Sequence, residues 1–123
     1  MANVINWFEI PVNDMKRAAK FYGEIFNTEL TIMSMGPHEM AFLPADDQES
    51  VSGSLCSGPD YMPSSEGTLI YLNANPDLNV MLKRVSDAGG VVMLPKRQIT
   101  PEYGYMAIFL DSEGNKVALH SME

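Results

Sequence analysis

The sequence contains two copies of one pattern, and this repeat constrains the fold more than any other feature. The segments DMKRAAKFYGEIFN (14–27) and DLNVMLKRVSDAGG (77–90) both begin with Asp and a large apolar residue, and both carry a Lys at the same internal position. Their apolar residues recur at helical spacing, so each segment predicts an amphipathic helix of nearly the same length. Asn13 and Asn75 are the predicted N-caps, with Pro76 in the first turn of the second helix.

Strand-like segments surround both helices in the same order. One precedes each helix (3–12 and 68–74), and three follow it (29–33, 39–43 and 51–56; 91–94, 105–110 and 116–121). We therefore expect a single α+β domain of two βαβββ modules, residues 1–57 and 67–123, joined by a Gly-, Pro- and Ser-rich linker over 58–66. Each helix covers one face of its sheet, so the other faces should curl into a half-open mixed β-barrel with a central cleft for a small molecule.

The charge and the cysteine content exclude several classes of protein. There are 8 basic and 16 acidic side chains, a net charge of −8, which disfavours nucleic-acid and membrane partners. A single cysteine, Cys56, excludes an intrachain disulfide and fits a reducing compartment. The first twelve residues lack a basic region and carry Glu9 inside the apolar stretch, unlike a signal peptide. We therefore expect a cytoplasmic protein.

Alternation along the strands predicts which side chains face the cleft. Phe8, Ile10 and Val12 form an apolar set for the helix, which leaves Trp7 and Glu9 on the opposite face. By the same rule Tyr71 of the fifth strand faces the cleft, and so do two residues of the last strand, Ala118 and His120. One carboxylate and one imidazole thus share the predicted inner surface.

Three segments resemble the vicinal-oxygen-chelate superfamily, which includes glyoxalase I, bleomycin- and fosfomycin-resistance proteins and extradiol dioxygenases. They are EIPVNDMKRAAKFY near the start, DLNVMLKRVSDAGG in the middle and FLDSEGNKVALH at the end. The resemblance covers essentially the whole chain. It implies paired βαβββ modules, often assembled as dimers, so we expect a homodimer. It does not specify the chemistry, because the superfamily contains isomerases, lyases, transferases, oxygenases and metal-free binding proteins.

The resemblance also implies where a metal would bind. In metal-using members the ligands are His, Gln or Glu on the first and last strands of the modules. Those positions correspond here to Trp7, to Ser52 or Gly53, to Thr68 or Leu69, and to Ala118. None offers the imidazole or carboxylate that a catalytic divalent metal requires, so we predict neither a metal at the usual site nor a cofactor.

Glu9 and His120 lie two residues beyond the expected ligand positions of the first and last strands. They could form an acid/base pair, a polar clamp for a ligand, or two ligands of a displaced metal site. The structural alternative is an ion pair or hydrogen bond that only satisfies two polar groups. Trp7, Tyr71 and Tyr103 could line an aromatic pocket, although strand aromatics more often simply pack.

Two further residues carry weaker signals. No local motif supports Cys56 as a catalytic thiol. His38 lies in a predicted turn, so we expect it to be exposed to solvent.

The sequence therefore predicts a protein that binds a small organic molecule without the usual divalent metal. Glu9 and His120 would orient the ligand, and Trp7, Tyr71, Tyr103 and Ala118 would contact it. The alternative is a glyoxalase-type lyase or isomerase that uses Glu9 as acid and base, with or without an unconventional metal.

Overall fold

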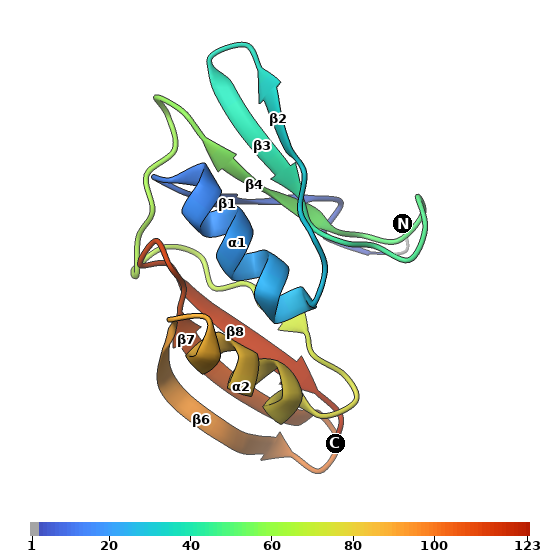
Figure 1. The fold of residues 1–123 in the computed structure, drawn as a ribbon. Helices are drawn as coiled ribbons and strands as arrows, with labels where there is room; N and C mark the ends of the chain where they lie inside the picture. Colours follow the sequence, from blue (N-terminus) through green and yellow to red (C-terminus); the bar gives the residue numbers. More distant parts are fainter. Residues whose placement is uncertain (1–2) are drawn as a thin grey trace. The chain divides into compact units, whose positions relative to one another are not determined.

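The computed structural model describes residues 3–123, which divide into two compact units at positions 63 and 64. This division lies inside the segment 58–66 that the sequence predicts as a linker. In each unit one helix lies against one four-stranded sheet (Figure 1). Within the described residues, no helix combines the length and the apolar character needed to cross a membrane.

The first unit has the element order βαβββ. Its elements are β1 (Phe8–Pro11), α1 (Met15–Phe26), β2 (Ile32–Met35), β3 (His38–Phe42) and β4 (Gly53–Ser57). The strands lie in the order β1-β4-β3-β2, with β1 parallel to β4 and the other pairs antiparallel. Ala18, Tyr22 and Ile25 of α1 are completely buried, so the apolar side of the helix closes the core of this unit.

The second unit repeats this architecture. Its elements are β5 (Tyr71–Asn73), α2 (Leu78–Asp87), β6 (Val91–Thr100), β7 (Gly104–Leu110) and β8 (Lys116–Ser121). The strand order is β5-β8-β7-β6, and β5 is parallel to β8. The predicted α+β class with two βαβββ units is confirmed, and the strands form two four-stranded mixed sheets.

The strand pairings align the two units residue by residue. Leu55 pairs with both Ile10 and Ala41 in the first unit, and Leu119 pairs with both Leu72 and Ala107 in the second. Leu55 and Leu119 are fully buried, each on the central strand that joins the parallel and antiparallel parts of its sheet. The two positions are therefore structural equivalents, and the neighbouring residues can be matched from them.

Both predicted N-caps are wrong. The caps are Asp14, whose carboxylate accepts a hydrogen bond from the Arg17 N–H at 3.1 Å, and Asp77, which accepts one from Asn79 at 2.9 Å. These carboxylates stand directly before the helices, where they reach free N–H groups of the first turn. Pro76 consequently precedes the cap and lies outside the first turn.

Candidate functional site

Glu9 lies on the face of the first sheet that α1 does not cover. Ile10 and Leu55 are buried on the α1 side, and paired residues of neighbouring strands point to the same face. Glu9 pairs with Ser54 and is therefore on the side opposite to Ile10. This surface, which we call the helix-free face, comprises Trp7, Glu9, Pro11, Met33, Met35, His38, Met40, Phe42, Ser54, Cys56 and Tyr61.

Two neutral donors hold the carboxylate of Glu9. Its Oε1 accepts a hydrogen bond from the Tyr61 hydroxyl at 2.7 Å, and its Oε2 accepts one from the Cys56 thiol at 3.3 Å. The Ser54 hydroxyl lies 3.3 Å from the same sulfur and donates to it, because the thiol proton is directed at Glu9. These two hydrogen bonds fix the orientation of the Glu9 carboxylate. Because Glu9 is exposed, its remaining lone pairs face solvent.

Both donors keep their protons at neutral pH. The hydrogen bond to Glu9 is the main cause that raises the pKa of Tyr61 to about 12, from an ordinary value of 10.0. Burial is the main cause that raises the pKa of the Cys56 thiol, and the nearby charge of Glu9 acts in the same direction. Cys56 is thus a neutral donor in the interior, which argues against a nucleophilic thiolate.

Replacing Tyr61 by Phe should remove a late step from the tyrosine titration. Because the pKa of Tyr61 rises on folding, its bond to Glu9 stabilises the native state below pH 10 and is lost as the pH rises towards 12. We expect ultraviolet absorbance to show one phenol titrating near pH 12 in the wild type, and no such step in Tyr61→Phe. Tyr103→Phe is the control, and an unchanged late step in Tyr61→Phe would contradict the assignment.

Exposed aromatic rings lie on the same face of the sheet as Glu9. Trp7 and Phe42 pack edge to face, with centroids 5.7 Å apart, and are 45% and 47% exposed. This exposure leaves apolar ring surface beside the carboxylate for a ligand to cover.

His38 is not exposed as the sequence predicts. Its ring packs edge to face on Tyr61 at 5.5 Å, and its Nε2 is buried without a hydrogen-bond partner among the described residues. The ring occupies the space that a side chain at Gly58 would fill. The sequence predicted His38 in solvent and did not point to Tyr61, because Tyr61 lies in a segment with the composition of a linker.

His120 lies in the second unit, on the face of its sheet opposite to α2. Its Nε2 is 2.6 Å from the backbone oxygen of Tyr103, and a carbonyl can only accept, so Nε2 carries the proton. Nδ1 has no hydrogen-bond partner among residues 3–123 and is left as an acceptor in the neutral ring. Tyr71 pairs with Ala118 on the same face.

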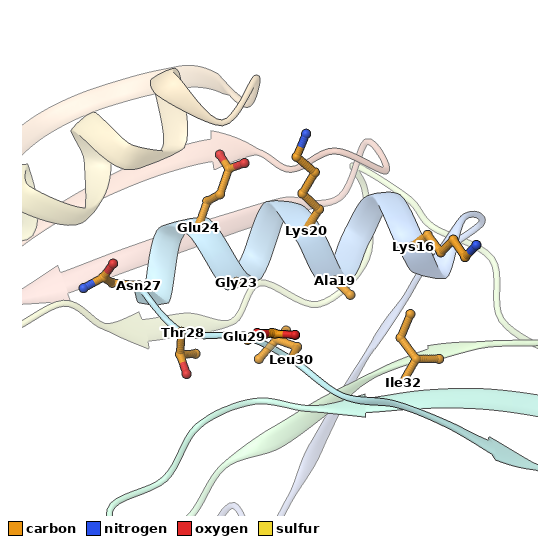
Figure 2. Close-up of a pocket in the computed structure, with 10 residues that line it drawn as sticks. All are labelled: Lys16, Ala19, Lys20, Gly23, Glu24, Asn27, Thr28, Glu29, Leu30 and Ile32. Atoms are coloured by element: carbon orange, nitrogen blue, oxygen red, sulfur yellow. The ribbon is translucent and has the colours of Figure 1, made fainter.

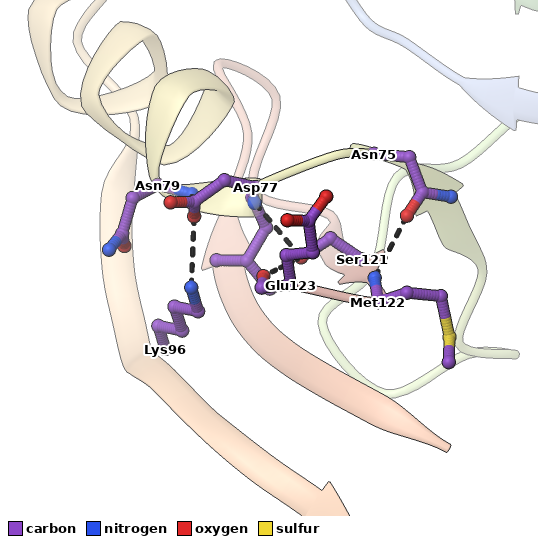
Figure 3. Close-up of polar contacts among 8 residues, drawn as sticks. Asn75, Asp77, Asn79, Lys96, Ser121, Met122 and Glu123 are labelled. Atoms are coloured by element: carbon purple, nitrogen blue, oxygen red, sulfur yellow. Dashed lines mark hydrogen bonds and ion pairs between the residues drawn. The ribbon is translucent and has the colours of Figure 1, made fainter. Parts of the chain in front are cut away.

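The chain end beyond His120 is fixed by hydrogen bonds. The Met122 N–H donates to the side chain of Asn75 at 2.8 Å (Figure 3). The Glu123 N–H donates to the Pro76 carbonyl at 3.1 Å. These bonds anchor the residues after β8 to the segment before α2. His120 therefore belongs to an anchored strand rather than to a fraying end.

The predicted site residues fall into two groups. In the first unit, Glu9 and Trp7 lie on the same face of the sheet, the helix-free face. In the second unit it brings His120 together with the backbone of Tyr103, whose side chain is 60% exposed. That Glu9 and His120 act on one ligand stays a prediction.

The residues at the usual metal positions do not fit a divalent metal. Matching Leu55 to Leu119 makes Ser54 the equivalent of Ala118, so the predicted placement at Ser52 or Gly53 is wrong by one or two residues. The same alignment makes Leu69 the equivalent of Trp7. Indole, hydroxyl, isobutyl and methyl groups at these positions are not a catalytic donor set. Within residues 3–123, no group of three or more His, Cys, Asp and Glu could hold a metal ion.

A pocket of the first unit lies away from the predicted site residues. It has a volume of about 570 Å³ and runs beside α1, where Lys20 and Glu24 extend away from Leu30 and Ile32 (Figure 2). A smaller pocket of about 330 Å³ occupies the corresponding place beside α2, lined by Asn79, Leu82, Lys83, Ser86 and Val92. Both pockets lie between a helix and the segment that follows it, and they recur because the two units have the same architecture. Neither pocket contains a predicted site residue.

Comparisons with known proteins agree with this architecture. A curated relative from Didymella fabae, a "Glyoxylase-like domain-containing protein", is 27% identical over 94% of this chain and 91% of its own length. The structure of a glyoxalase I mutant from Zea mays matches with a TM-score of 0.69 and 19% identity over 94% of this chain, which spans only 45% of that protein. TnmS3, an antibiotic-binding protein from Streptomyces sp. CB03234, matches with a TM-score of 0.64 and 22% identity over 98% of both chains.

A family model identifies the superfamily to which the chain belongs. The model of the Glyoxalase/Bleomycin resistance protein/Dioxygenase superfamily matches residues 4–119, which include all the helices and nearly all of the strand residues. With its two βαβββ units and this match over nearly its whole length, the chain belongs to the glyoxalase/bleomycin resistance protein/dioxygenase superfamily.

Proposed function

We propose that this protein binds a small organic molecule without a divalent metal, and that Glu9 anchors the ligand on the helix-free face. The observation that carries the proposal is the oriented, exposed carboxylate of Glu9, held by Tyr61 and Cys56 beside the ring surface of Trp7 and Phe42. A few fixed polar groups among apolar and aromatic side chains are typical of small-molecule sites.

The comparisons support binding as the kind of function. TnmS3, which shares this fold, is an antibiotic-binding protein, so the architecture is compatible with holding an organic molecule. In the proposed arrangement Glu9 accepts a hydrogen bond from the ligand and Trp7 covers an apolar part of it. We also propose ligand contacts for His120, Tyr71, Tyr103 and Ala118. The homodimer and the cytoplasmic location stay predictions.

Metal-free binding can be tested by thermal unfolding after treatment with EDTA. We expect small aromatic compounds from a fragment set to raise the melting temperature by several degrees at saturation, because native-state ligands stabilise. Zn²⁺, Ni²⁺, Mn²⁺ and Mg²⁺ should leave it unchanged. Trp7→Ala should abolish the shift caused by the compounds, whereas Val80→Ala, at an exposed position on α2, should retain it. A metal-induced rise of several degrees that disappears in Glu9→Ala would overturn the proposal.

A glyoxalase-type lyase or isomerase is the second candidate. The exposure of Glu9 favours it, because an oriented carboxylate in contact with solvent could remove a proton next to a carbonyl group. Its test is turnover of the hemithioacetal of methylglyoxal and glutathione. Activity that Glu9→Gln abolishes at an unchanged melting temperature would favour catalysis over binding alone.

A further inference from the structure

The charges of the first unit indicate what kind of ligand Glu9 would accept. We infer, on the basis of the proposed function, that the ligand carries a cationic group, an ammonium or a guanidinium, on an apolar body, with Glu9 as its counter-ion.

The negative charge of the protein is concentrated in the first unit. Residues 1–63 contain three basic and nine acidic side chains, a formal charge of −6, whereas residues 64–123 contain five and seven, a charge of −2. All three basic residues, Lys16, Arg17 and Lys20, belong to α1. Because α1 covers the opposite face of the sheet, the first unit places no lysine or arginine on the helix-free face.

Among the described residues of its own unit, 3–63, Glu9 therefore has no cationic partner. Its two hydrogen bonds come from the hydroxyl of Tyr61 and the thiol of Cys56, which stay uncharged at neutral pH. They orient the carboxylate and leave its charge uncompensated. Because Glu9 is exposed, the oriented carboxylate stays accessible to a ligand from solvent. A cationic ligand would supply the missing opposite charge through a charge-assisted hydrogen bond.

The surrounding side chains favour a cation attached to an apolar body. Exposed Trp7 and Phe42 offer ring faces, which attract ammonium and guanidinium groups within about 6 Å. Met33 and Met40, which pair across β2 and β3 on the same face, are flexible and can adapt to the shape of an apolar group. An anionic ligand would be repelled by Glu9, and a neutral ligand would gain only the apolar contact.

The fluorescence of Trp7 gives a direct readout, because it is the only tryptophan in the chain. We propose titrations at pH 7 with benzylammonium, benzyl alcohol and benzoate, which share an aromatic body and differ in charge. Benzylammonium should bind about tenfold more tightly than benzyl alcohol, and benzoate should bind most weakly. Added salt should weaken benzylammonium binding alone, because only this probe is attracted by the charge.

Glu9→Gln removes the charge while its amide oxygen can still accept one of the two hydrogen bonds. In this variant benzylammonium and benzyl alcohol should bind with equal affinity, at a melting temperature close to that of the wild type. Glu29→Gln, which removes an exposed carboxylate outside the helix-free face, should keep the tenfold preference.

The outcomes separate this inference from the proposed function. Equal affinities for the cation and the alcohol in the wild-type protein would overturn the cationic ligand and leave organic-molecule binding in place. No response of Trp7 to any of the three probes would overturn both. A Trp7 emission that depends on protein concentration without any probe would show that a second copy covers this face, and would also overturn the inference.

Discussion

Replacing Gly104 by Ala is expected to lower the free energy of unfolding by about 3 kcal/mol. Gly104 is buried at the start of β7, with a φ of +83°, in the left-handed region that a side chain adopts only with strain. An added Cβ would also contact the backbone oxygen of Ser121 in β8 and lie 3.1 Å from the Cα of Met122. Because these are backbone atoms of an anchored segment, β8 itself would have to shift.

Gly114→Ala is the matched control. Gly114 has nearly the same φ, +86°, but apart from its chain neighbours no heavy atom of residues 3–123 lies within 4 Å of its added Cβ. It should therefore lose only the conformational part, about 1 kcal/mol. Urea unfolding followed by circular dichroism measures both losses. In Gly104→Ala the NMR signals of the His120 ring should also shift, because Tyr103, whose carbonyl binds that ring, directly precedes Gly104. Equal losses in the two variants would contradict the steric argument.

The repeat and the strand alternation carry most of the fold prediction. The alternation around Ile10 correctly separates the α1 side of β1 from the helix-free face, because strand periodicity depends only on neighbouring residues. The sequence predicts that the strand after the second helix ends at position 94, before Pro95. In the structure this strand, β6, continues to Thr100. Pro95 is tolerated because β6 is the edge strand of its sheet and its pairing with β7 contains register shifts.

The environment of Glu9 could not be predicted, because its contacts cross long stretches of sequence. Tyr61 is 52 residues away from Glu9, and Cys56 is 47 residues away. No sequence periodicity links a loop residue to a strand residue that far away. The sequence therefore offered no indication that Tyr61 contacts Glu9. His38 shows the same problem, because its place depends on Gly58 leaving room for the ring. The sequence predicted the face of Glu9, and only the structure shows which donors hold it.

Replacing Leu55 by Ala is expected to cost about 3–4 kcal/mol of stability. Leu55 is fully buried on β4, where it pairs with Ile10 on one side and with Ala41 on the other. Removing three carbon atoms leaves a cavity between α1 and the sheet, and the paired backbone of three strands limits how far the core can collapse into it. Urea unfolding measures the loss, and a cost below about 1.5 kcal/mol would contradict this view of the core.

Leu119→Ala makes the same test in the second unit. Because the strand pairings make Leu119 the equivalent of Leu55, and both are fully buried, the two variants should lose similar amounts of stability, within about 1 kcal/mol of each other. Val80→Ala, at a residue that is 57% exposed on α2, should lose less than about 0.5 kcal/mol. A large loss for one leucine and a small one for the other would mean that only one unit depends on its own core. The residue-by-residue alignment that matches Ser54 with Ala118 would then lose its energetic support.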